Sequence, residues 1–168
     1  NYVYEFYAGV FDILFYWELF WLIFFNVFGR KQDPNGAYAA AIPKFIKAFI
    51  NYQSPIIHGD GSQSRDFTYI DDATNILIEL RKKNIQKNDI YNVCSNNPIG
   101  LKKILNFFQK ISPKTKIIKR EFQKSDVYKT HGSNKSIIEK TKYKQFENVN
   151  KALQKTHDWY LKNKKFYK

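Results

Sequence analysis

Two loops carry the side chains whose types and spacing are best suited to bind a ligand. In residues 25–38, a hydrophobic stretch around Asn26 runs into a polar loop that contains Gly29. α/β folds place ligands where a buried strand ends in such a loop. In residues 58–72, a glycine-containing loop delivers Arg65 onto the start of a strand, where its guanidinium suits bidentate contact with a phosphate. Judged from the residues alone, either loop is equally well a structural turn.

The cysteine and histidine content excludes several other chemistries. With one cysteine, Cys94, the chain cannot form an intramolecular disulfide. Cys94 ends an apolar run and has no paired base beside it, which favours a buried thiol over a nucleophile. The three histidines and the cysteine show no metal-ligand spacing. The sequence therefore predicts no metal site, and a reducing cytoplasm is the expected compartment.

The elements that must position these loops alternate between helices and short strands. Helices are expected in five segments. Three of them are residues 39–50, 101–111 and 149–162. A fourth helix would be capped by Asp71 or Asp72 and run to Leu80, and a fifth would be capped by Ser133 or Asn134 and run to Thr141. Short strands are expected at residues 56–57, 65–70, 90–94 and 116–118. This order predicts an α/β fold, and nothing in it suggests an all-β or helical-bundle architecture.

Residues 10–28 are almost entirely apolar and aromatic, about the length of a membrane span. Asp12 and Glu18 lie inside the segment, and a carboxylate is costly in lipid. The pattern therefore favours a buried helix that runs into a buried strand over a membrane helix. The segment lacks the basic start and small-residue cleavage site of a signal peptide.

The formal charge of +13 attracts anions, which include nucleic acid, acidic membranes and phosphorylated substrates. The chain is rich in lysine, asparagine, isoleucine and aromatic residues throughout, and such a composition raises the charge without any binding role. No stripe of basic residues interleaved with exposed aromatics is evident. A basic module that binds nucleic acid or an anionic membrane is kept as the alternative function.

Four motifs follow one another at close spacing and together resemble one family. They are Phe-Asn-Val-Phe-Gly-Arg from Phe25, Asp-Pro-Asn-Gly-Ala-Tyr from Asp33, Ile-Pro-Lys-Phe from Ile42, and Gly-Asp-Gly-x-x-Ser-Arg-Asp-Phe-x-Tyr-Ile from Gly59. This run resembles the extended short-chain dehydrogenase/reductase family. The best match is to NAD-dependent epimerases acting on UDP-N-acetylglucosamine or its uronic acid, with UDP-glucuronate 4-epimerases close behind. The resemblance implies an isomerase with a UDP-sugar substrate.

The resemblance also implies a division of the chain and a missing partner segment. Residues 1–30 would be the end of a Rossmann-type cofactor-binding domain, and residues 31–168 the nucleotide-sugar-binding domain. The chain has 168 residues, about half the family length, and no methionine, so we expect a carboxy-terminal fragment with most of the Rossmann domain absent. A homodimer, or an upstream domain supplied by another chain, is the expected protein partner.

The family motifs assign binding roles to individual residues of this chain. Asn26 and Arg65 would contact the diphosphate of the substrate, and Asp126 the ribose hydroxyls. Ala40, Ala41, Lys44 and Phe45 would line the nucleotide site near the uracil, and Ile56 and His58 would occupy uracil or ribose positions. Gln123 is a further expected contact, although the family has a second phosphate-binding arginine there.

The departures from the family pattern concern catalysis. Tyr2 aligns with the tyrosine that acts as base and then acid beside the cofactor, but Phe6 replaces the lysine that lowers the pKa of that tyrosine. No Gly-x-x-Gly-x-x-Gly occurs to cradle the phosphates of NAD. We therefore expect this chain to be inactive alone and to retain UDP-sugar binding.

Overall fold

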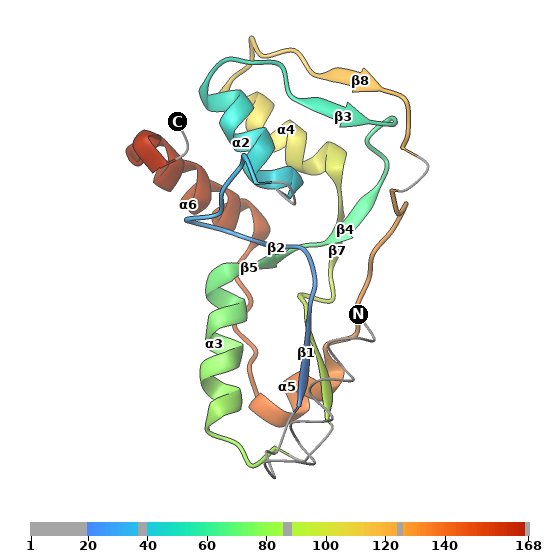
Figure 1. Ribbon diagram of the computed structural model, residues 1–168, viewed down its shortest axis with the longest axis vertical. Coiled ribbons are helices and arrows are strands. Elements are labelled where there is room, and N and C mark those ends of the chain that lie inside the picture. The colour runs from blue at the N-terminus through green and yellow to red at the C-terminus, as the bar shows by residue number, and fades with distance from the viewer. Residues whose placement is uncertain (1–19, 37–39, 86–88, 124–125, 167–168) are drawn as a thin grey trace.

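The computed structural model describes residues 20–36, 40–85, 89–123 and 126–166 (Figure 1). The described strands form four two-stranded pairs, of which three are parallel. The parallel pairs are β1 (Trp21–Phe24) with β6 (Ile90–Val93), β2 (Val27–Phe28) with β5 (Thr68–Tyr69), and β3 (Ile56–His58) with β8 (Ile118–Arg120). The antiparallel pair is β4 (Ser64–Asp66) with β7 (Pro98–Gly100).

The helices alternate with these strands, which confirms the predicted α/β class. They are α2 (Ala41–Ile50), α3 (Ile70–Arg81), α4 (Leu101–Ile111), α5 (Lys135–Thr141), α6 (Val149–Lys162) and a 3-10 turn, η1 (Lys164–Phe166). Helices α4 and α6 begin and end at the predicted residues. The predicted helix at 39–50 corresponds to α2, with Ala40 as its N-cap and Ala39 outside the described residues.

Helical periodicity explains why α4 forms and where it packs. Its buried residues, Leu101, Ile104, Leu105 and Phe108, recur at the spacing that places them on one face. The ring of Phe108 stacks on that of Phe49 from α2, with 5.5 Å between the ring centroids. Ser112 ends the helix, as predicted, because Pro113 cannot continue it.

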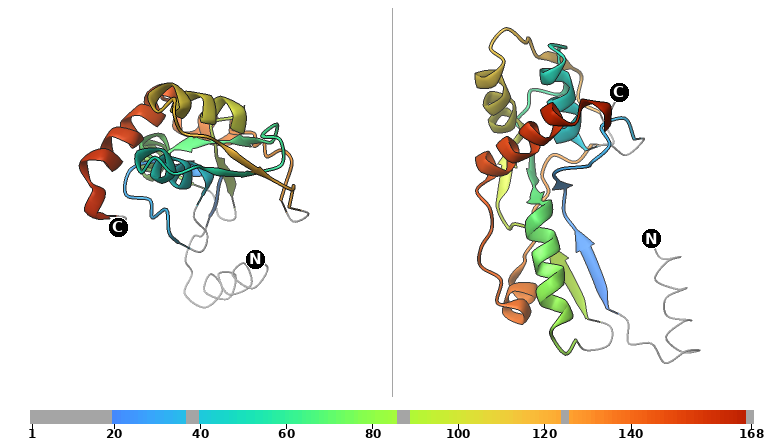
Figure 2. Two further views of the ribbon diagram at one scale, coloured as in Figure 1. Left: turned by 90° about the horizontal axis from the view of Figure 1, so that it is seen from above. Right: turned by 90° about the vertical axis from the view of Figure 1, so that its left-hand side faces the viewer.

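Two buried clusters hold the molecule together. The larger joins α2, α4 and α6 to β2, β3, β5 and β7, and includes Ile46, Phe108 and Leu153. The smaller joins α3, β6 and α5, and includes Ile76, Val93 and Ile137. Figures 1 and 2 show the helices of the first cluster gathered at one end of the molecule and those of the second at the other. The predicted division at residue 30 stays a prediction.

The strand predicted at 65–70 is wrong in its extent. Two short strands, β4 and β5, flank Phe67, and Ile70 is the first residue of α3. The predicted caps of that helix are also wrong, because Tyr69 is the N-cap and no side chain caps the helix. Both aspartates lie in the first turn and are engaged elsewhere: Asp71 pairs with Arg30, and Asp72 accepts hydrogen bonds from Tyr143 and Glu147.

Three smaller predictions also need correction. The strand predicted at 116–118 lies at Ile118–Arg120, since its pairing with β3 sets the register. The strand predicted at 90–94 ends at Val93. Asn134 is the N-cap residue of α5, but its side chain donates to the carbonyl of Cys94 and does not cap the helix.

The aromatic segment at residues 10–28 is described from residue 20 onward, and the predicted helix lies outside the described residues. The strand that should follow is present as β1 and β2, separated by Phe25 and by Asn26, which has a φ of 38°. Phe28 is buried, but Ile23 and Phe24 are each 48% exposed, so the strand is less buried than predicted. Within the described ranges, no helix has the length and apolar character needed to span a membrane.

Candidate functional site

A cavity of about 500 Å³ lies between α2, the start of α4, the β3–β8 pair and the segment that follows β8. Its apolar wall comes from Phe45, Ile56, Ile57 and Leu101, and its polar rim from Lys44, His58, Arg120, Gln123 and Asp126. The cavity therefore combines an apolar surface with a rim that carries two cationic side chains, an imidazole, an amide and a carboxylate.

Seven of the residues predicted to bind the nucleotide line this one cavity. They are Ala41, Lys44, Phe45, Ile56, His58, Gln123 and Asp126. These residues come from three segments, 41–45, 56–58 and 123–126, and the folding of the chain brings the third, 65 positions beyond His58 at Gln123, to the other two. Arg65 and Asn26 lie outside the lining, Ala40 is the N-cap of α2, and Tyr2 lies outside the described residues.

The turn between β3 and β4 follows directly after His58, a lining residue of the cavity. Gly59 and Gly61 have φ values of 82° and 81°, a backbone region that glycine adopts without steric cost. A Cβ atom on Gly59 would lie 2.8 Å from the side-chain nitrogen of Gln63. Between the glycines, hydrogen bonds from the Ser62 side chain and backbone lower the pKa of Asp60 to about 2. The loop predicted from glycine content is thus a tight, internally bonded turn.

Arg65 fixes the segment that carries Asp126. Its Nη2 lies 2.6 Å from Asp126 Oδ1, and its Nη1 donates to the carbonyls of Ser64 and Tyr128 at 2.9 and 3.2 Å. The Arg65 side chain is 12% exposed, so the guanidinium forms these contacts largely shielded from water. The pair places Asp126 at the cavity rim and neutralises its charge there.

His58 and Gln123 form a polar contact across the rim. His58 Nδ1 lies 3.2 Å from the carbonyl oxygen of Glu121, which can only accept, so Nδ1 donates this bond. In the neutral ring, Nε2 then accepts, and the amide nitrogen of Gln123 lies 3.5 Å from it. These two contacts connect the His58 side chain to the segment that follows β8.

Asn26 is held inside the fold. Its side-chain nitrogen donates to Thr130 Oγ1 at 3.0 Å and to the carbonyl of Asp66 at 3.4 Å. The Asp66 carboxylate is fully buried and accepts from Ser95 and from the backbone of Gly132. This network ties the end of β1 to β4 and to the segment beyond Asp126, and so connects Asn26 to the region of Arg65.

Three lining residues were not singled out from the sequence: Ile57, Leu101 and Arg120. Ile57, in a strand, and Leu101, in a helix, belong to the larger core. The apolar pattern of these elements predicts buried residues there and does not indicate ligand contacts. Arg120 was missed because the sequence places the strand two residues earlier. The position of β8 depends on its pairing with β3, and the sequence alone does not show this pairing.

Cys94 is a buried thiol, as the sequence analysis favours. Cys94 is fully buried, and burial raises the pKa of its thiol to about 11, which keeps it protonated at neutral pH. Across the residues that the structure describes, no three histidine, cysteine or acidic side chains gather in a way that could hold a metal ion.

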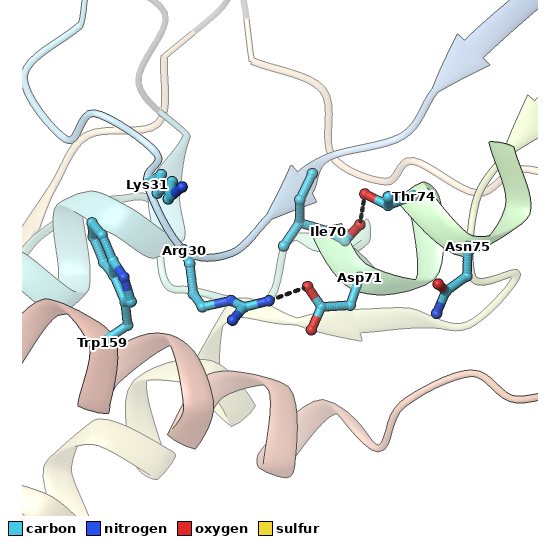
Figure 3. A pocket seen from close by; sticks show the side chains of 7 residues that line it. All are labelled: Arg30, Lys31, Ile70, Asp71, Thr74, Asn75 and Trp159. Carbon is cyan, nitrogen blue, oxygen red and sulfur yellow. Dashed lines mark hydrogen bonds and ion pairs between the residues drawn. The ribbon is translucent and has the colours of Figure 1, made fainter. Parts of the chain in front are cut away.

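A second cavity, of about 390 Å³, lies where the start of α3 faces α6 (Figure 3). Its lining residues are Arg30, Lys31, Ile70, Asp71, Thr74, Asn75 and Trp159. Arg30 Nη2 lies 2.7 Å from Asp71 Oδ1, a contact that raises the pKa of the Arg30 guanidinium. Because this cation is already paired and none of the predicted binding residues lines the cavity, the first cavity is the better candidate site.

Comparison with known proteins gives a family match. Residues 15–94 match the model of the "NAD dependent epimerase/dehydratase family". The UDP-glucuronate 4-epimerase of Thermodesulfobacterium geofontis is 31% identical over 144 residues, which cover 83% of this chain and 42% of that protein. Protein CapI of Staphylococcus aureus is 26% identical over 158 residues, covering 83% of this chain and 46% of CapI. The matched part of this chain thus spans less than half the length of each of these curated relatives.

Solved structures share the fold. The UDP-N-acetylglucosamine 4-epimerase of Methanobrevibacter ruminantium, in complex with UDP-N-acetylmuramic acid, superposes with a TM-score of 0.84 at 28% identity over 95% of this chain and 51% of that chain. An epimerase of Methanothermobacter thermautotrophicus superposes with a TM-score of 0.87 at 24% identity, over 96% of this chain and 48% of that one. The predicted Rossmann-type, short-chain dehydrogenase/reductase fold is confirmed.

The family description implies NAD, but the described residues do not fit its pyrophosphate. A dinucleotide site needs a glycine-rich loop between a strand and a helix. The connection from β2 to α2 contains Gly29 and Gly36 but not the Gly-x-x-Gly-x-x-Gly spacing, and α3 and α4 begin immediately after β5 and β7 with no loop between them. Tyr2, the predicted cofactor contact, lies outside the described residues.

Proposed function

The chain belongs to the NAD dependent epimerase/dehydratase family through residues 15–94, and on that premise we propose that it binds the UDP group of a UDP-sugar and forms the substrate-binding portion of a 4-epimerase. The observation that carries the proposal is the convergence of seven predicted nucleotide contacts on one cavity. The relatives named as acting on UDP-glucuronate and UDP-N-acetylglucosamine support this substrate class.

The chemistry of the cavity suits such a ligand. The apolar wall at Phe45 and Ile57 offers a surface for a planar base, and the cationic side chains of Lys44 and Arg120 offer a rim for phosphate. Arg65, 2.6 Å from Asp126, stabilises the carboxylate that would accept hydrogen bonds from ribose hydroxyls. A nucleoside diphosphate combines these three groups in one molecule.

Catalysis requires more than this cavity provides. The sequence carries Phe6 in place of the expected lysine and no glycine-rich dinucleotide loop. We therefore propose that these 168 residues bind the UDP-sugar without converting it, and that turnover needs a cofactor-binding domain from another chain or segment.

A thermal-shift measurement with separate ligands tests the proposal. UDP-N-acetylglucosamine should raise the melting temperature of the chain in proportion to the logarithm of its concentration, since it binds the folded state alone. NAD should leave the melting temperature unchanged. No shift with the UDP-sugar at millimolar concentration would refute the proposed binding function.

Two variants locate the binding. Lys44→Gln, on the rim of the proposed site, should reduce the shift, whereas Lys31→Gln, in the second cavity, should leave it as in the unmodified chain.

Duplex DNA serves as a third ligand. A shift with DNA that disappears with added salt, without one for the UDP-sugar, would favour the alternative of a nucleic-acid-binding module.

A further inference from the structure

Arg120 lies at the end of β8, where pairing with β3 fixes its backbone. Its partner in the parallel register is His58, and its carbonyl accepts a hydrogen bond of 2.8 Å from the backbone of Gly59. Arg120 and His58 therefore lie side by side at the same edge of the cavity, and both line it. The neighbouring Lys119 is also exposed but does not line the cavity.

The charges around the cavity are unbalanced. Among the described residues that line it, Asp126 is the one carboxylate, and it is already paired with Arg65 at 2.6 Å. Lys44 and Arg120 are the cations among these described lining residues, and neither forms an ion pair with a described carboxylate. Two unpaired cations on the rim of a partly apolar cavity favour a ligand that carries about two negative charges.

The neutral residue at position 123 makes the contribution of Arg120 more important. Gln123 reaches His58 with its amide group and adds no charge to the rim. Arg65 is held by Asp126 and two carbonyls, so its guanidinium has little freedom to engage a further group. The Arg120 side chain forms no such contact with the residues that the structure describes, and its planar guanidinium can donate two parallel hydrogen bonds to one phosphate group.

We infer that Arg120 is a further substrate-binding residue, which binds the diphosphate group of the ligand and supplies the positive charge that Gln123 does not. The inference deepens the proposed function and rests on it for the class of ligand, a nucleoside diphosphate. Arg120, at the exposed end of β8, then contributes to the affinity for the phosphates of the ligand and not to the affinity for its base. Removing the phosphates from the ligand should remove the effect of Arg120.

Isothermal titration of the full chain with UDP, uridine and inorganic pyrophosphate tests the inference. Arg120→Gln should weaken UDP and pyrophosphate binding about 10-fold or more, because a hydrogen bond to a charged group is lost. The same variant should bind uridine as the unmodified chain does. Lys119→Gln removes an equal charge one residue away and should change each affinity by less than about two-fold, since it lies outside the lining.

The outcomes separate this inference from the proposed function. Equal UDP affinity in Arg120→Gln and the unmodified chain would overturn the role of Arg120 and leave the UDP site intact. Pyrophosphate binding that depends on Arg120, without any binding of UDP, would support the role of Arg120 and overturn the proposed function. An equal loss in Lys119→Gln, or no binding of any of the three ligands, would overturn the inference.

Discussion

Two arginine–aspartate pairs of this chain have similar geometry in different surroundings. The pair of Arg65 and Asp126 spans 2.6 Å, and the Arg65 side chain is 12% exposed. The pair of Arg30 and Asp71 spans 2.7 Å, but the Arg30 side chain is 49% exposed. Exposed ion pairs contribute at most about 1 kcal/mol, because water and salt screen them. The two pairs should therefore differ in their contribution to stability.

Replacing Arg65 with alanine should lower the free energy of unfolding by about 2 kcal/mol. The change removes a charge-assisted bond to Asp126 and leaves the carbonyls of Ser64 and Tyr128 without this donor. Arg30→Ala serves as the matched control and should cost less than about 1 kcal/mol. Urea unfolding of both variants measures the difference, and equal losses would contradict the structural role assigned to Arg65.

At the level of single residues, the predicted ligand contacts stay predictions, but several of them lie together in the structure. The sequence identified Lys44, His58 and Asp126 through the family motifs, and the structure gathers them at one cavity. It could not show that Asn26 bonds inward to Thr130, because that contact joins residues 104 positions apart. Arg120 was missed for the same reason, since its position depends on pairing between distant strands.

At the scale of elements, the close approach of the end of β2 to α3 restricts which residue can occupy position 29. A Cβ atom on Gly29 would lie 2.1 Å from Ile70 Cγ2 and 2.7 Å from Ile70 Cβ. Ile70 is the first residue of α3, so the end of one element packs directly on the start of another. Glycine is required at position 29 because any larger residue would force the two elements apart.

Gly29→Ala should therefore destabilise the chain by about 1–3 kcal/mol, the usual cost of overpacking a close contact. Gly36→Ala is the control, since its Cβ atom would meet Asp33 no closer than 3.8 Å, an ordinary contact distance. Thermal unfolding monitored by circular dichroism compares them. A melting temperature of Gly29→Ala equal to that of Gly36→Ala would show that the contact with Ile70 relaxes without cost.

The elements differ in how far the sequence determines them. Local periodicity set both ends of α4, whose apolar face repeats over three turns. The strands contain two to four residues, too few to show a period, and their limits follow from their partners. Two differences from the sequence prediction follow from this dependence. They are the position of β8 at Ile118–Arg120 and the start of α3 at Ile70, directly after β5.

At the scale of the whole molecule, the candidate site and the second cavity lie in different surroundings. The first lies on α2, the start of α4 and the β3–β8 pair, at the end of the molecule that holds the larger core. The second lies where α3 faces α6. A ligand in the first should therefore stabilise β3, β8 and the first turn of α2, and leave α3 and α5 unaffected.

Hydrogen–deuterium exchange of the chain, with and without saturating UDP, tests whether the nucleotide binds at the first cavity. Amide exchange reports local opening, and a bound ligand suppresses opening where it contacts the chain. We predict slower exchange in peptides that cover β3, β8 and residues 41–45, and unchanged exchange in α3 and α5. Protection confined to the peptides around Arg30 and Trp159, or no protection at all, would contradict the assignment of the nucleotide site.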